Sequence, residues 1–230
     1  MKISGIQKLS LLDYPDKTAC TVFTWGCNFR CPFCHNASLV TDKEYDVEED
    51  KEEFFKFLEK RKHVLDGVAI TGGEPLMQDN MGDFIKRVKD MGFSVKLDTN
   101  GSYPDKLKDL VSQHLVDYVA MDIKNSREKY ATTIGFSSYD LAKVDESIAY
   151  LLSGATKYEF RTTVVKDYHT EEDFVSIGQW IKGAEKYFLQ KFVDSGNLIQ
   201  GGLEGFEEAD MLRFRDAVKG AVRSVEIRGL

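Results

Sequence analysis

Three closely spaced cysteines are the residues most able to do chemistry in this sequence. Cys27, Cys31 and Cys34 follow the spacing Cys-x3-Cys-x2-Cys. Thiols clustered in this way, in a chain from a reducing compartment, indicate metal binding or redox chemistry rather than disulfides. A structural zinc site takes four ligands, whereas three thiolates on a four-iron cluster leave one iron open for a chelating ligand. The spacing favours the open iron–sulfur cluster, with a structural zinc knuckle or simply buried cysteines as alternatives.

Further polar or glycine-rich groups follow, or lie within, the next β-rich runs of the chain. They are Gly72, Gly73 and Glu74; Asp98 and Thr99; Asp122 and Lys124; and Arg161. Functional groups of parallel α/β folds gather where the strands end, so we expect these side chains to meet at one rim. Two carboxylates at such a rim need a partner, which Lys124 or a bound cation would supply. A structural ion pair explains them equally well.

The glycine pair and the arginine each allow two interpretations. Paired glycines let a backbone approach a ligand closely, and Glu74 could accept hydrogen bonds from an ammonium group, but the same pattern occurs in plain turns. Arg161 interrupts a β-rich run, where an inward arginine needs a partner. That partner is either the carboxylate of a ligand or an acidic neighbour.

Short β-rich runs alternate with helical patterns along the chain. The β-rich runs are residues 18–25, 67–71, 94–98, 118–122, 158–164 and 187–192, with 222–227 as a candidate edge strand. Apolar spacing predicts helices around residues 84–91, 141–151, 174–181 and 211–218, and a charged surface helix over 48–62. Thr170 and Asp173 indicate a capping box, and Cys20, inside the first run, is expected to be a core residue.

This alternation predicts an α/β fold with parallel strands joined by right-handed crossovers. Both a partial (β/α)6 barrel and an open doubly wound sheet satisfy the pattern. The length of 230 residues suits a single domain of residues 1–230 with a sizeable core.

The composition excludes several functional classes. The chain has 31 Lys and Arg against 38 Asp and Glu, a formal net charge of −7. It therefore lacks the basic footprint of sequence-independent nucleic-acid binding. No apolar run approaches the roughly 18 residues of a membrane span, and the first residues lack the apolar core of an export signal. We expect a cytoplasmic protein that binds neither nucleic acid nor membranes.

The cysteine motif, with the aromatic Phe33 before its last cysteine, resembles the cluster motif of the radical S-adenosylmethionine (SAM) superfamily. Residues 10–17 and 26–36 further resemble the activating enzymes of glycyl-radical enzymes, most closely the anaerobic ribonucleoside-triphosphate reductase activating type. The sequence departs from that pattern at Asp16, where glycine is usual. The resemblance implies a partial (β/α)6 TIM-like barrel with one 4Fe-4S cluster and SAM as cofactors.

The resemblance also implies a role for each candidate residue. Cys27, Cys31 and Cys34 would hold the cluster. The SAM contacts would be Phe33 near the adenine, Gly72, Gly73 and Glu74 at the amino group, Arg161 at the carboxylate, and Asp98, Thr99, Asp122 and Lys124 around SAM and a monovalent cation. Phe192 is a further candidate to pack on the adenine.

In the family that the chain resembles, the cofactors carry the difficult chemistry, so no side chain is expected to act as a general base. An electron from a flavodoxin- or ferredoxin-type donor breaks the S–C5′ bond of SAM, and the 5′-deoxyadenosyl radical removes a hydrogen atom from a glycine of the partner. Anaerobic ribonucleotide reductase is the expected partner, with pyruvate formate-lyase-like enzymes as another option. The alternatives are a small-molecule enzyme similar to 7-carboxy-7-deazaguanine synthase, a zinc-binding module and an electron-transfer protein.

Overall fold

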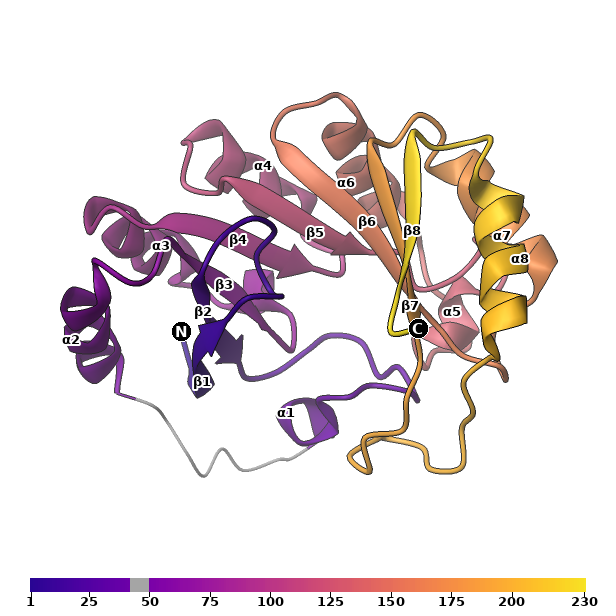
Figure 1. The fold of residues 1–230 in the computed structure, drawn as a ribbon, viewed down its shortest axis with the longest axis horizontal. Coiled ribbons are helices and arrows are strands. Elements are labelled where there is room, and N and C mark those ends of the chain that lie inside the picture. Colours follow the sequence, from indigo (N-terminus) through magenta and orange to yellow (C-terminus); the bar gives the residue numbers. More distant parts are fainter. Residues whose placement is uncertain (42–49) are drawn as a thin grey trace.

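Eight strands form one sheet whose spatial order follows the chain from β1 to β8 (Figure 1). The computed structural model describes residues 1–41 and 50–230. The strands are β1 (Ile3–Ser10), β2 (Ala19–Thr24), β3 (Gly67–Gly72), β4 (Ser94–Thr99), β5 (Tyr118–Asp122), β6 (Lys157–Val164), β7 (Lys186–Lys191) and β8 (Ser224–Arg228). β1 runs antiparallel to β2, and every following pair is parallel. All the predicted β-rich runs, including the edge strand, therefore form strands.

Helices occupy the connections between the parallel strands. They are α1 (Ala37–Thr41), α2 (Lys51–Arg61), α3 (Met81–Asp90), α4 (Pro104–Ser112), α5 (Tyr130–Thr133), α6 (Ala142–Leu152), α7 (Glu171–Trp180) and α8 (Glu208–Val218), with a 3-10 turn η1 (Pro75–Met77). The predicted helices are confirmed, and α7 begins at the predicted capping box of Thr170 and Asp173. The predicted surface helix corresponds to α2, although residues 48 and 49 lie outside the described residues.

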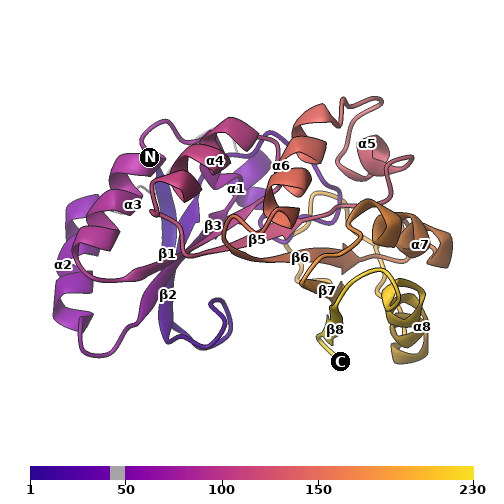
Figure 2. The same cartoon turned by 90° about the horizontal axis from the view of Figure 1, so that it is seen from above.

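The order of the strands decides between the two predicted architectures. A doubly wound sheet reverses its strand order at a switch point, but the order from β2 to β8 has no reversal. Right-handed crossovers that all advance in one direction place their helices on one face of the sheet. Figure 2 shows these helices along the convex side, which leaves a concave inner face between the edge strands β1 and β8. The fold is a partial (β/α) barrel, as predicted, with β8 as a seventh parallel strand.

Alternation along β4 shows how one strand serves both the core and the concave face. Val95 and Leu97 are wholly buried in the apolar core, whereas Asp98 lines a cavity on the concave side. Successive side chains of a strand point to opposite faces, so Lys96 shares the face of Asp98. In β2, Cys20 is wholly buried, as expected of a core residue.

Among residues 1–41 and 50–230, none of the helices combines the length and the apolar character that crossing a membrane requires.

Candidate functional site at the carboxyl ends of the strands

A cavity of about 290 Å³ lies against the carboxyl ends of the parallel strands. Its size is close to the lower end of the range for ligand pockets, roughly 300 Å³. The residues that the sequence assigns to the site line this cavity, except Glu74 and the further adenine candidate Phe192: they are Cys27, Cys31, Phe33, Cys34, Gly72, Gly73, Asp98, Thr99, Asp122, Lys124 and Arg161. The structure thus brings together residues that are spread over more than half of the sequence.

The cysteine loop after β2 supplies three thiols to one wall of the cavity. Cys31 is buried, and Cys27 and Cys34 are half-buried. Burial raises the pKa of Cys27 to about 12 and that of Cys31 to about 11, while the nearby ammonium of Lys124 opposes both shifts. Buried thiols of this kind ionise only beside a strong positive centre, such as a bound metal. The loop is therefore suited to hold a metal group rather than free thiolates.

The arrangement of the three cysteine sulfurs indicates which kind of metal group they could bind. In the described part of the chain, no three His, Cys, Asp or Glu side chains converge tightly enough to ligate a single metal ion. The sulfurs around a cubane bind different irons, so they need not meet at one point. One sulfur is further anchored by the chain, because the N–H of Phe29 donates to Cys27 Sγ at 3.3 Å.

The Gly-Gly-Glu segment packs directly on the start of the cysteine loop. The N–H of Gly73 donates to Thr24 O at 2.9 Å, and that of Glu74 donates to Gly26 O at 2.8 Å. A Cβ atom on Gly73 would lie 1.9 Å from Gly26 O, and Gly72 has φ +112°, a region that disfavours side chains. These glycines therefore permit a close approach to the backbone at the end of β2 and the start of the cysteine loop.

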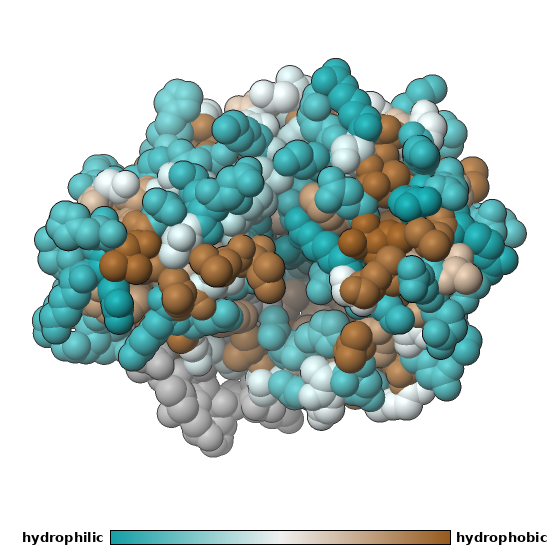
Figure 3. Space-filling view, viewed as in Figure 1, coloured by the Kyte–Doolittle hydropathy of each residue, from teal (hydrophilic) through white to brown (hydrophobic). Residues whose placement is uncertain are grey.

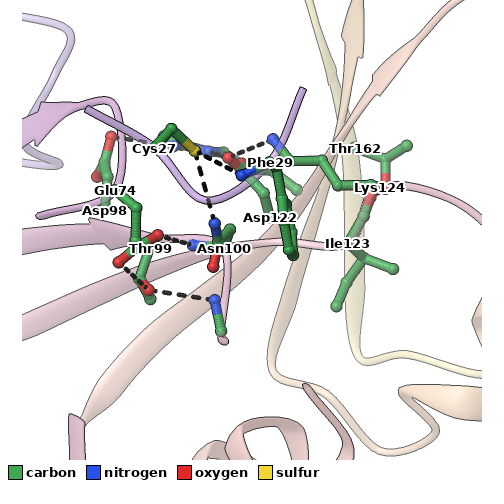
Figure 4. Close-up of polar contacts among 12 residues, drawn as sticks. Cys27, Phe29, Glu74, Asp98, Thr99, Asn100, Asp122, Ile123, Lys124 and Thr162 are labelled. Atoms are coloured by element: carbon green, nitrogen blue, oxygen red, sulfur yellow. Dashed lines mark hydrogen bonds and ion pairs between the residues drawn. The ribbon is translucent and has the colours of Figure 1, made fainter. Parts of the chain in front are cut away.

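Glu74 is wholly buried, and its neighbours Gly73 and Thr99 line the cavity in its place. Its Oε1 accepts hydrogen bonds from Leu76 N at 3.0 Å and Thr99 Oγ1 at 2.9 Å, and its Oε2 accepts from Asn100 N at 2.7 Å (Figure 4). Burial raises the pKa of Glu74 to about 7, although these donors favour the charged form. The carboxylate thereby ties the end of β3 to the end of β4.

Five charged side chains from β4, β5, β6 and the segment just after β5 form one network on the concave face. Arg161 bridges two carboxylates, with Nη2 2.9 Å from Asp98 Oδ2 and Nε 2.6 Å from Asp122 Oδ1. Lys124 Nζ lies 2.9 Å from Asp122 Oδ2, and Lys96 pairs with Asp98 Oδ1. Burial alone would raise the pKa values of Asp98 and Asp122, but the neighbouring cations hold both below the usual range.

Two residues of this site escaped the sequence-based prediction. Lys96 precedes Asp98 by two positions, and strand alternation alone would have placed both on one face. Asn100 lies in the turn after β4, and its Nδ2 lies 3.9 Å from Cys27 Sγ (Figure 4). The same nitrogen lies 2.9 Å from Asn28 Oδ1. Strand alternation accounts for the pairing of Lys96 with Asp98, whereas only the fold brings Asn100 near the cysteine loop.

The two aromatic candidates differ in their positions. Phe33 is buried at the cavity wall and packs against Tyr168, with ring centroids 5.6 Å apart. Phe192 is also buried, but its ring stacks on His35 at 5.3 Å, and His35 is the ring that lines the cavity. The His35 Nε2 lies 3.0 Å from Val193 O, which holds the imidazole over Phe192.

The family model of the radical SAM superfamily matches residues 21–181, which include the cysteine loop, the glycine pair and the charged network. The chain belongs to the radical SAM superfamily. A relative from Methanocaldococcus jannaschii, provisionally named as a glycyl-radical enzyme activating enzyme, is 33% identical over 83% of this chain and 79% of its own. The pyruvate formate-lyase-activating enzyme of Clostridium pasteurianum is 30% identical over 54% of this chain and 52% of its own.

Solved structures of other proteins share the fold. Streptococcus suis SuiB superposes with a TM-score of 0.71 at 11% identity, over 91% of this chain and 48% of SuiB. A domain of a pyruvate-formate lyase-activating enzyme from Bacteroides vulgatus superposes with a TM-score of 0.57 at 16% identity, over 71% of this chain and 99% of that domain. At these identities the likeness establishes the architecture alone.

Membership of the superfamily implies a radical SAM enzyme with a 4Fe-4S cluster and SAM as its cofactors. The donor set fits these groups, because thiols and cationic side chains line the same cavity.

Proposed function

We propose that the chain is a cytoplasmic activating enzyme that generates the glycyl radical of a partner enzyme, working as one domain of residues 1–230. The observation that supports this most is the meeting of the cysteine loop, the glycine pair and the charged network around one cavity. The bound cofactors supply the radical chemistry, and the chain binds, orients and shields them. A binding role for the chain fits this site, because the carboxylates of Asp98 and Asp122 are both in ion pairs.

Each part of the cavity has a proposed task. Cys27, Cys31 and Cys34 hold the 4Fe-4S cluster, and the network of Asp98, Asp122, Lys124 and Arg161 orients the amino acid part of SAM. Gly72 and Gly73 form the wall beside the cysteine loop, and Glu74 with Thr99 fixes that wall from behind. Phe33 offers an aromatic edge for the adenine. The charges of the cavity support this arrangement, since the guanidinium of Arg161 and the ammonium of Lys124 suit a ligand carboxylate.

Anaerobic ribonucleotide reductase is the proposed partner, with a flavodoxin- or ferredoxin-type protein as electron donor. The relatives named for glycyl-radical enzymes support a partner of this class. The molecular surface also suits a peptide substrate. Figure 3 shows one face hollowed between two groups of hydrophobic residues. The turn after β1 exposes Leu11 and Leu12, at 72% and 89%, next to Asp13 of the cavity wall.

The test is to mix the anaerobically reconstituted protein with purified anaerobic ribonucleotide reductase, SAM and a flavodoxin-type reductant, and to record the EPR spectrum. We expect the doublet of a glycyl radical in the partner. A partner whose radical glycine is replaced by alanine is the matched control and should show no doublet. SAM cleavage without any glycyl signal would instead favour a small-molecule substrate and contradict the proposed function.

A further inference from the structure

Lys96 is a buried cation that the family motifs do not include. It lies in the middle of β4 and is 3% exposed. A buried ammonium is costly unless it is paired, and the partner of Lys96 is Asp98 Oδ1. The register sets Lys96 beside Ala69 of β3 and Tyr118 of β5. The small Ala69 leaves room for the lysine side chain to extend toward Asp98.

The neighbouring acidic group has its own partners and does not compete for Lys96. Glu159 is 1% exposed, and Arg228 binds both of its oxygens, at 2.9 and 3.1 Å. The hydroxyl of Tyr118 donates to the same carboxylate at 2.9 Å. The charge of Lys96 is therefore directed at Asp98.

With Lys96 included, every carboxylate oxygen of Asp98 and Asp122 has a positively charged partner. Asp98 presents one oxygen to Lys96 and the other to Arg161. Asp122 presents one oxygen to Arg161 and the other to Lys124. Three positive groups thus face two negative groups, which leaves the network with one surplus positive charge. Each of the four carboxylate oxygens already binds a cation of the chain, so a metal cation at these oxygens would be repelled by the positive group beside it.

We infer that the ammonium of Lys96 takes the place of a monovalent metal cation at the Asp98–Asp122 pair, so that the site binds SAM without one. An ammonium is a compact charge with three donors, which makes it a close substitute for such an ion. Lys124 is less suited to this role because its charge lies near Cys31, at the cluster side of the cavity. Lys96 is then a positioning residue, because it holds Asp98 in line with Arg161. In naming SAM as the ligand, the inference rests on the proposed function.

The test replaces potassium by choline, a cation too large for such a site. Calorimetry would measure the dissociation constant of SAM for the reconstituted protein in KCl and in choline chloride. The wild type should bind SAM equally in both salts. Lys96→Met, which keeps the length of the side chain, should bind SAM about tenfold more weakly in choline and recover affinity in potassium. Lys86→Met, in an exposed pair with Asp90, should behave as the wild type.

A second measurement does not involve the cluster. The melting temperature of cluster-free Lys96→Met should rise when potassium replaces choline, whereas that of the wild type should not change. A wild type that loses SAM affinity in choline would overturn the inference, and that comparison needs no variant to fold. Lys96→Met that matches the wild type in choline would also overturn it. Neither measurement includes the partner enzyme, so a failure of glycyl-radical formation leaves this test intact.

Discussion

The amide nitrogen of Asn100 lies 3.9 Å from the sulfur of Cys27, although 73 positions separate the two residues in the sequence. The same nitrogen donates to Asn28 Oδ1 at 2.9 Å, and the backbone N–H of Asn100 donates to Glu74 at 2.7 Å. The turn after β4 thus joins the cysteine loop to the glycine-rich segment after β3. This contact fixes the relative positions of the two motifs before any cofactor binds.

Asn100→Ala should loosen the cysteine loop, because the change removes the hydrogen bonds of the Asn100 side chain to Asn28 Oδ1 and Ser102 N at a buried turn. We expect a loss of about 1–3 kcal/mol in the free energy of unfolding and poorer retention of iron on gel filtration. Urea denaturation of the cluster-free protein measures the first effect. Asn197→Ala, in an exposed loop, is the control. Equal stability of the two variants would contradict the structural role of Asn100.

Arg161→Met should destabilise the fold strongly, because it removes the cation shared by two half-buried carboxylates. The expected cost is about 3 kcal/mol. Arg127→Met also removes an Arg–Asp pair, with Asp145, but that pair is exposed and should cost less than about 1 kcal/mol. The two midpoints of urea denaturation can be compared directly. A similar, small cost for both variants would show that the network does not depend on Arg161.

Glu74 should make stability depend on pH. Because its pKa is raised from 4.5 to about 7 in the folded protein, the folded state binds the proton more tightly than the unfolded state. The contribution is therefore fully present below pH 4.5 and is lost as the pH rises through about 7. Glu74→Gln cannot titrate, so the stability difference between wild type and variant should shift by up to about 3 kcal/mol over this range. Denaturation at several pH values measures that shift, and a constant difference would disprove the raised pKa.

The sequence predicted most strands because a parallel sheet buries both faces, so its strands read as short apolar runs such as that of β3. β1 escaped prediction because its sequence mixes lysine, glutamine and glycine with apolar residues, and it is an edge strand that is partly exposed. The choice of a barrel over a doubly wound sheet needed the strand order, which local patterns do not contain.

The candidate site, like the fold, was predictable only in part from the sequence. Positions at strand ends could be predicted to converge because parallel strands end at one rim. The pairing of Lys124 with a carboxylate of the rim was predicted as one option. The two partners of Arg161 could not be predicted, because its side chain reaches from β6 to both Asp98 and Asp122. Glu74 was assigned to the ligand, but in the structure its three hydrogen bonds are to its own chain. A sequence motif identifies the residue type, and only the fold determines what each side chain contacts.

The proposed cluster ligands can be tested most directly by iron and sulfide analysis after anaerobic reconstitution. The matched pair is Cys31→Ala, at the cavity, and Cys20→Ala, wholly buried in β2. The wild type and Cys20→Ala should each hold about four irons and four sulfides per chain, whereas Cys31→Ala should lose that stoichiometry. Cys31→Ala that retains about four irons per chain would contradict the assignment of the three cysteines as the cluster ligands.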